Sequence, residues 1–378
     1  MSSPRGDAAR QRRAAVAVAV VGAGGPAGRA VLRELVGAAA RGSAGAPGGA
    51  RIGEVVAVDL DPVEVGGTHW RQADPGDPAL AAALHDVDAA VYVAAQTDLA
   101  QEIAEGRRAR RDRSLRRAQT VITASAAAGV RHLVVVTSAQ VFGALPDNPV
   151  PLPDDAPLRA SADGGLVGDL MDVEELVSVA REVHPGLRLT VVRPAALVGE
   201  GVDTVLTRHF EAPRLLTVRG AGPAWQFCHL DDLGTAVAVV VAHGLGPVVT
   251  VGSQGHLDED QVERLTGMRR VELSLPVAQG TADRLHRVGV LPTPASDLLY
   301  VVHPWAVSSA TLRAAGWEAA YDNETCLGVL LEGIRGSHAV AARRIDRKDA
   351  ALGAASAAVA VVGTAAIMRR RRRKGGGA

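Results

Sequence analysis

The chain of 378 residues is poor in the residues and patterns that mark several classes of protein. Its two cysteines, Cys228 and Cys326, lie far apart without CxxC spacing, so no disulfide framework is expected and a reducing, cytoplasmic location is favoured. None of its eleven histidines belongs to an HExxH or similar pattern, which argues against a metal site. The formal net charge is zero, whereas nucleic-acid binding needs an excess of basic surface. We therefore expect neither a metal ion nor a nucleic-acid partner.

Strand-like and helix-like patterns alternate through the first half of the chain. Apolar strands are predicted at 14–21, 52–59, 89–95, 132–137 and 189–193, with helices at 28–40, 114–128 and 173–183 between them. The first apolar run is short and ends in glycines, so it is typical of a buried strand and not of a signal peptide. Near-continuous apolar strands separated by helices predict an α/β fold, a Rossmann-type doubly wound parallel sheet.

The pattern loosens after Pro194, where connections rich in proline and glycine begin. We expect a disordered N-terminus at 1–14, a Rossmann domain at 15–200 and a smaller C-terminal substrate lobe at 201–340. Some elements of this lobe should return to the core. An Ala-rich and polybasic tail follows at 341–378.

A glycine-rich turn separates the first strand from the first helix. The string VVGAGGPAG spaces Gly22, Gly25 and Gly28 as GxxGxxG. With a strand before it and a helix after it, such a turn can hold a pyrophosphate at the helix N-terminus. The second strand ends in Asp59, a carboxylate that can accept both ribose hydroxyls and would repel a 2′-phosphate, so NAD is favoured over NADP. A glycine loop without a ligand is the alternative. The turn residues expected at the cofactor are Gly22, Gly24, Gly25, Pro26, Ala27 and Gly28.

Several motifs follow one another in an order typical of one family. They are VVGAGGPAG, VVAVDLD, QADPGD, DAAVYVAAQ, VRHLVVVTSAQVFG, LTVVRPAALVGEG, QFCHLDDLGTAV and HPWAVSSATLRAAGW. Over 14–333 the chain resembles the extended short-chain dehydrogenase/reductases, the NAD-dependent epimerase/dehydratase group. Within that group it looks most like an actinobacterial branch that is sugar-nucleotide epimerase-like. The resemblance implies bound NAD and a homodimer formed through two helices beside the active site.

Carried over by position, the resemblance implies roles for individual residues. Asp74 would lie near the adenine, Ala94 and Ala95 along the pyrophosphate–ribose crevice, and Pro194 with Ala195 beside the nicotinamide. Three further positions follow from the same resemblance. Ser138 occupies the place of the catalytic serine or threonine, although a hydroxyl that caps a strand-end turn is an equal alternative, and His229 and Asp232 would be structural.

The family's Tyr-x-x-x-Lys pair is missing. In this pair the tyrosine is the general acid/base and the lysine lowers its pKa. The matching helix reads LVGDLMDVEELV, which puts Val167 at the tyrosine position and Met171 at the lysine position. No lysine precedes Lys348, and the tyrosines lie elsewhere, at Tyr92, Tyr300 and Tyr321.

Other residues could carry chemistry, but two further departures from the family weaken the link to its substrates. Asp169 or Asp172 could replace the missing acid/base, although acidic residues at helical spacing commonly form a solvated face. Ser114 stands about where the family has an asparagine. Trp225 stands where an arginine would hold the phosphate of a sugar nucleotide, so such a substrate is doubtful.

The tail combines an uncharged run at 350–368 with the basic string RRRRRK. It is long enough to span a bilayer, but a span would export the basic residues against the positive-inside tendency. A peripheral helix on an anionic membrane surface avoids that objection. A disordered tail with a solvated charge run is the third alternative.

Three functions remain open from the sequence. The first is an NAD-binding sensor, regulator or scaffold without the usual redox chemistry, which we favour. The second is an NAD-dependent epimerase, dehydratase or reductase that acts on a sugar-nucleotide-like or other small substrate through non-standard residues such as Ser138. The third is an accessory protein at a membrane surface, in which the Rossmann domain serves only as a platform.

Overall fold

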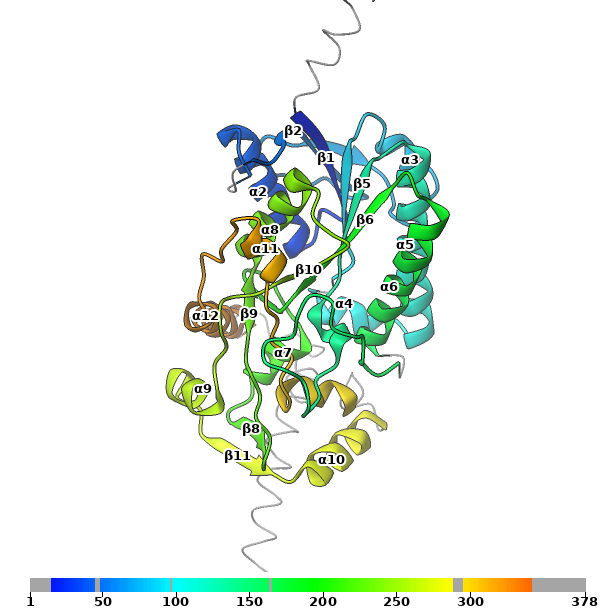
Figure 1. Cartoon of the computed structure of the whole chain (residues 1–378). Coiled ribbons are helices and arrows are strands. Elements are labelled where there is room, and N and C mark those ends of the chain that lie inside the picture. The colour runs from blue at the N-terminus through cyan, green and yellow to red at the C-terminus, as the bar shows by residue number, and fades with distance from the viewer. Residues whose placement is uncertain (1–14, 45–47, 96, 163–164, 288–294, 342–378) are drawn as a thin grey trace, which may run out of the picture.

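Seven parallel strands form the central sheet of the protein (Figure 1). The structure, a computed structural model, describes residues 15–44, 48–95, 97–162, 165–287 and 295–341. The strand order is β10-β6-β5-β4-β1-β2-β3. The strands are β1 (Ala15–Val21), β2 (Arg51–Asp59), β3 (His69–Gln72), β4 (Ala89–Val93), β5 (His132–Val136), β6 (Arg188–Pro194) and β10 (Val248–Val251). The predicted α/β fold with a Rossmann-type parallel sheet is therefore confirmed.

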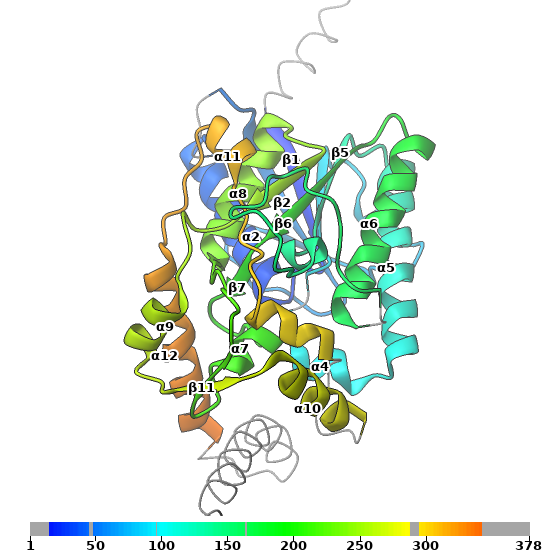
Figure 2. The ribbon, with the colours of Figure 1, turned by 60° about the horizontal axis from the view of Figure 1, so that its bottom comes forward.

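Helices cover both faces of the sheet, which explains why its strands are apolar on both sides. Along β1, Val18 and Val20 pack into the core on one face, whereas Ala19 and Val21 pack into the core on the other. The first core is covered by α2 (Pro26–Arg41) and α8 (Leu230–His243), and the second by α3 (Leu80–Ala83), α5 (Arg107–Ala127) and α6 (Leu166–Val183). Figure 2 shows α5 and α6 side by side along one flank of the sheet.

The remaining elements gather beyond the carboxyl ends of the strands and along one side. They are α4 (Leu99–Ala104), η1 (Ala139–Phe142), β7 (Ala196–Val198), α7 (Val205–His209), β8 (Leu215–Val218), β9 (Phe227–His229), α9 (Glu259–Thr266), β11 (Arg270–Leu273), α10 (Leu275–Arg287), η2 (Ala295–Val301), α11 (Ala310–Ala314) and α12 (Asn323–Ala341). β7 pairs with β9 and β8 pairs with β11, each in parallel. α8 and β10 belong to the layers of the sheet although they follow residue 200.

Both ends of the chain fall outside the described residues, including the N-terminus at 1–14 and the tail from 342 onward. The predictions of disorder and of membrane contact concern those segments. Among the described residues, no helix is long and apolar enough to cross a membrane.

Candidate functional site

The glycine turn between β1 and α2 has the close packing that a dinucleotide site requires. Gly22 has a φ of +76°, and a Cβ on Gly28 would lie 2.6 Å from the Gly22 carbonyl oxygen. Gly25 is the N-cap of α2, has no side-chain cap, and precedes Pro26 at the first helical position. The first-turn N–H groups of a helix have no partner within it and favour an anion. The turn therefore packs closely against the first turn of α2, and a pyrophosphate would fit at the N-terminus of this helix.

Asp59 ends β2 beside this turn. Its Oδ2 accepts a hydrogen bond from the Gly24 N–H at 2.8 Å, and its Oδ1 accepts one from the Leu60 N–H at 2.8 Å. Each carboxylate oxygen can accept a second hydrogen bond. The carboxylate is thus fixed at a strand end with capacity for two ribose hydroxyls, so the residues present fit NAD.

The other residues implied at the cofactor also lie at strand ends. The Ala94 and Ala95 N–H groups both bond to the Val136 carbonyl oxygen at 2.9 Å. Asp74 follows β3, and its Oδ1 accepts the Gly76 N–H at 2.8 Å. Pro194 is the last residue of β6. Since the strands are parallel, these positions share the carboxyl edge of the sheet with the glycine turn.

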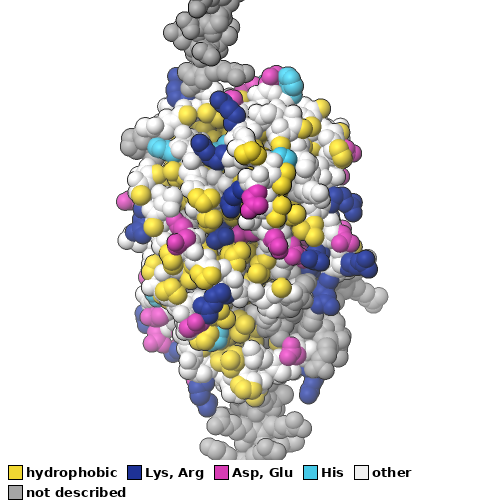
Figure 3. Space-filling model, turned by 45° about the vertical axis from the view of Figure 1, so that its right-hand side comes forward, with side chains coloured by type: hydrophobic (Ala, Val, Ile, Leu, Met, Phe, Trp, Pro, Cys, Tyr) yellow, Lys and Arg dark blue, Asp and Glu magenta, His cyan; other side chains and the backbone are white. Residues whose placement is uncertain are grey.

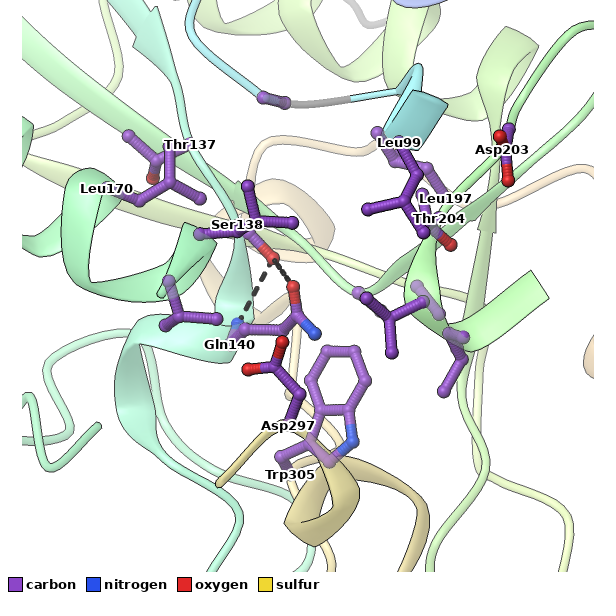
Figure 4. A pocket seen from close by; sticks show the side chains of 17 residues that line it. Leu99, Thr137, Ser138, Gln140, Leu170, Leu197, Asp203, Thr204, Asp297 and Trp305 are labelled. Atoms are coloured by element: carbon purple, nitrogen blue, oxygen red, sulfur yellow. Dashed lines mark hydrogen bonds between the residues drawn. The ribbon is translucent and has the colours of Figure 1, made fainter. Parts of the chain in front are cut away.

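A cleft that is partly open to solvent lies at this edge. Ala95 and Ala195 line it from the sheet, α6 and α7 form two walls, and Trp305 closes one end (Figure 4). Ser138 lies in the cleft and is also the N-cap of η1, where its Oγ accepts the Gln140 N–H at 3.2 Å. Both alternatives for this hydroxyl, the turn cap and the site residue, are therefore compatible with its position.

The wall formed by α6 is apolar. Leu166, Val167 and Leu170 line the cleft, whereas Met171 is not among the lining residues. Val167, at the tyrosine position, therefore lines the cleft, and the α6 residues that line it include no acid, no base and no positive charge.

Asp169 and Asp172 do not line the cleft, because both pair with α5. Asp169 is fully buried, with its Oδ2 2.6 Å from Arg110 Nε, and Asp172 lies 2.5 Å from Arg111 Nε. Burial raises the pKa of Asp169 and the Arg110 guanidinium opposes that rise. The interpretation of a solvated acidic face is wrong for Asp169. Basic and acidic side chains stand side by side on this flank of the molecule (Figure 3).

A buried ion pair that was not predicted from the sequence lies directly behind the cleft. Arg193 contacts both carboxylate oxygens of Glu174, with Nη2 2.5 Å from Oε2. Thr137, next to Ser138, donates to Glu174 Oε1 at 2.7 Å. The guanidinium also lies 4.7 Å above the centre of the Phe142 ring. This network joins α6 to β6 and fixes the end of β5 that carries Ser138.

Trp225 belongs to a buried aromatic cluster instead of the cleft. Its ring stacks on His209 at 5.5 Å between centroids and meets Phe210 edge-on at 5.2 Å. Burial lowers the pKa of His209 to about 4, so this imidazole is neutral at pH 7. Thus neither of these residues supplies a positive charge for a phosphate.

His229 and Asp232 lie where α8 begins and have structural contacts. Asp232 accepts the Ala320 N–H at 2.7 Å and the Tyr321 N–H at 3.1 Å, and the His229 ring stacks on Tyr321 at 3.8 Å. Ser114 lies within α5, half-buried and outside the lining of the cleft. No group of three or more histidine, cysteine or acidic residues that could hold a metal occurs in the described part of the chain.

Comparison with solved structures finds the same fold in sugar-nucleotide enzymes. A dTDP-glucose 4,6-dehydratase of Streptomyces venezuelae with NAD bound matches with a TM-score of 0.60 and 18% identity, over 84% of this chain and 97% of its own. A UDP-glucose 4-epimerase of Thermotoga maritima with UDP-glucose matches with a TM-score of 0.59 and 16% identity, over 85% and 99%. At these identities the likeness shows the fold alone.

Among curated proteins, an uncharacterized protein of Mycobacterium tuberculosis is 26% identical over 234 residues. The match covers 60% of this chain, and the chain spans 61% of the length of that relative. A family model, described as the NAD dependent epimerase/dehydratase family, matches residues 18–252. Because that match covers more than half of the chain, the chain belongs to the NAD-dependent epimerase/dehydratase family.

Proposed function

We propose that this chain is an NAD-binding protein that recognises a small molecule without the redox chemistry of its family. It would act as a cofactor-dependent sensor, regulator or scaffold in the cytoplasm. One observation carries the proposal: an apolar wall of Leu166, Val167 and Leu170 faces the cleft, beside a glycine turn and an Asp59 that fit NAD.

The polar groups near this wall support recognition better than proton transfer. A positioned acid/base contributes about 100- to 10,000-fold in rate. The Ser138 hydroxyl donates to the Gln140 side-chain oxygen at 3.4 Å, and a neutral amide does not take up a proton at ordinary pH. NAD, when bound, would supply a hydride acceptor. The chain's own Ser138 and Gln140 would orient a ligand group through hydrogen bonds.

The experiment is calorimetric titration of the purified protein with NAD and NADH. Gly25→Asp puts a carboxylate at the N-cap of α2, where a Cβ has open space to 3.9 Å, so the variant should fold and lose binding. Gly186→Asp is the matched control, because a Cβ there meets nothing within 4 Å. Micromolar binding that is lost only in Gly25→Asp supports the proposal. Absence of binding at millimolar NAD refutes it.

A second candidate function, an enzyme with unusual residues, is favoured by one observation. Asp297 lines the same cleft as Ser138 and Gln140 (Figure 4), and a carboxylate can act as a base. In that case, turnover of a substrate, followed as a change in NADH absorbance, would be abolished by both Asp297→Asn and Ser138→Ala. If the protein binds both NAD and a ligand but does not convert the ligand, the result supports the first function, an NAD-binding protein without redox chemistry.

A further inference from the structure

We infer that two paired loops, residues 97–99 and 201–203, form a strap over the N-terminus of α2 and set the rate at which a dinucleotide enters and leaves. The inference rests on the proposed function, since it concerns access to the same NAD site. It depends on three features of the strap: its internal pairing, its contacts with α2 and the cleft, and the ion pair that holds it to α7.

The strap joins two segments that are distant in the sequence, one after β4 and the other after β7. The Leu99 N–H donates to the Asp203 carbonyl oxygen at 2.9 Å, and the Asp203 N–H donates to the Thr97 carbonyl oxygen at 2.8 Å. Asp98 and Asp203 thereby form an isolated parallel bridge that belongs to no named strand. Two backbone hydrogen bonds of this kind can open locally without disrupting a sheet.

The strap rests on the first turn of α2. A Cβ on Gly201 would lie 3.3 Å from Pro26 Cγ, and a Cβ on Gly25 would lie 3.9 Å from Thr97 Oγ1. Gly25 is the N-cap of α2 and Pro26 is its first residue, which is the position at which a pyrophosphate is expected. Thr97 is buried. The strap therefore covers this end of the helix.

The strap also forms part of the cleft wall. Leu99 and Asp203 line the cleft on the side away from Ser138 (Figure 4). Asp59 contacts the glycine turn at Gly24, before the N-cap of α2. A dinucleotide with its ribose at Asp59 and its nicotinamide in the cleft must pass the N-terminus of α2, beneath the strap. Its entry therefore requires the strap to lift.

An ion pair with α7 holds the strap in place. Arg208 donates to the Asp203 carboxylate through Nε at 2.7 Å and through Nη2 at 2.6 Å, one contact to each oxygen. The Arg208 and Asp203 side chains are 19% and 30% exposed, so water and salt weaken the pair less than they would a fully exposed one. Asp98 anchors the other loop, because its Oδ1 accepts the Gln101 N–H at 2.9 Å and caps α4. A strap anchored in this way slows binding and release alike, since both need it open.

Stopped-flow mixing of the protein with NADH, followed by the fluorescence of the reduced nicotinamide, tests the inference. The observed rate should level off as the NADH concentration rises, because opening of the strap becomes limiting. Release is measured by displacing bound NADH with excess NAD. The strap is closed before and after binding, so loosening it should change Kd less than it changes either rate.

Removing the ion pair should speed up exchange in both directions. Arg208→Gln should raise the limiting association rate and the dissociation rate by about three- to tenfold each. Arg208→Lys keeps the charge and should restore part of the wild-type rates, because it loses the two-point contact only. Arg219→Gln is the control, since it breaks an exposed ion pair with Glu272 outside the strap. It should leave both rates unchanged.

Two glycine substitutions separate contact with α2 from backbone strain. Gly201 and Gly220 have nearly the same φ, +77° and +75°, so alanine is similarly strained at both positions. A Cβ on Gly201 meets Pro26, whereas a Cβ on Gly220 meets nothing within 4 Å. Gly201→Ala should therefore push the strap away from α2 and accelerate exchange, and Gly220→Ala should not. The inference is overturned if Gly201→Ala and Arg208→Gln both exchange NADH at the rates of Gly220→Ala.

The outcomes separate this inference from the proposed function. NADH binding with rates that none of the variants changes overturns the strap and leaves the proposed function standing. Binding by Arg208→Gln without binding by the wild type refutes the proposed function for the native chain and supports the strap. If neither protein binds NADH, both fail.

Discussion

The Asp59 carboxylate at the end of β2 accepts a hydrogen bond from the Gly24 N–H at 2.8 Å, and so joins the end of this strand to the glycine turn that follows β1. The same carboxylate accepts the Leu60 N–H. Two backbone donors fix its direction before any ligand arrives. A preorganised acceptor of this kind loses little freedom on binding.

Asp59→Asn should weaken NAD binding by about 10- to 100-fold, because hydrogen bonds to a charged group contribute about 1.5–3 kcal/mol. The variant should also lose its preference for NAD over NADP, since the charge that repels a 2′-phosphate is gone. Calorimetry with both dinucleotides measures the two effects. Asp61→Asn, two residues further on at an exposed position, is the control. A wild-type protein that binds NADP more tightly than NAD would contradict this assignment.

Gly28→Ala should lower the free energy of unfolding by about 1–3 kcal/mol. The new Cβ would lie 2.6 Å from the Gly22 carbonyl oxygen and 2.8 Å from the Ala23 Cα, and these backbone atoms have no room to move. Gly37→Ala in the same helix meets only the end of the flexible Arg41 side chain. It should stabilise by about 0.5–1 kcal/mol. Urea unfolding of both variants is the measurement, and equal stability of the two would refute the packing argument.

Glu174→Gln should lower the free energy of unfolding by about 3 kcal/mol, because it leaves the Arg193 guanidinium buried without a counter-charge. Both side chains of the pair are less than a tenth exposed. The control is Glu175→Gln, since Glu175 is exposed on the same helix. That change should stay within about 0.5 kcal/mol. Similar unfolding curves for the two variants would show that the buried pair contributes little.

Local patterns were sufficient to predict five of the seven strands and the glycine turn, but not β3 or β10. Near-continuous runs such as that of β5 identify strands covered on both faces, and the strand–glycine–helix order identifies the turn. The strands and the turn are both determined mainly by residues that are neighbours in the sequence. The predicted strand at 14–21 is observed as Ala15–Val21, and the one at 132–137 as His132–Val136.

The sequence could not reveal what depends on partners far along the chain. Asp169 looks like a solvated acid until Arg110, 59 residues away, is placed against it. The helix predicted at 114–128 is observed as α5, which begins earlier, at Arg107. On α6, apolar residues stand at Leu166, Val167, Leu170 and Met171, so nothing in the sequence marks which of them line the cleft.

Stability should fall as the pH drops from about 6.5 to 4, because two histidines are buried in the neutral form. Burial lowers the pKa of both His132 and His209 to about 4. In the unfolded chain a histidine titrates near 6.5, so below that pH the unfolded state binds more protons than the folded state. Each histidine then lowers the free energy of unfolding by about 1.4 kcal/mol per pH unit until the folded pKa is reached.

Substitutions distinguish the contribution of these histidines to the pH dependence of stability from that of carboxyl groups, which titrate in a neighbouring pH range. His209→Phe keeps an aromatic ring against Trp225 and removes the titration, so it should reduce the slope of stability against pH between 6 and 4.5 by about 1.4 kcal/mol per unit. His132→Gln should do the same, and its side-chain amide can reach the position of His132 Nε2 that contacts the Thr190 hydroxyl. His85, whose side chain is 77% exposed, gives the control His85→Gln, which should leave the slope unchanged. Urea unfolding at several pH values decides the question: a His209→Phe protein with the wild-type slope would mean that this imidazole is already protonated, or solvated, in the folded state.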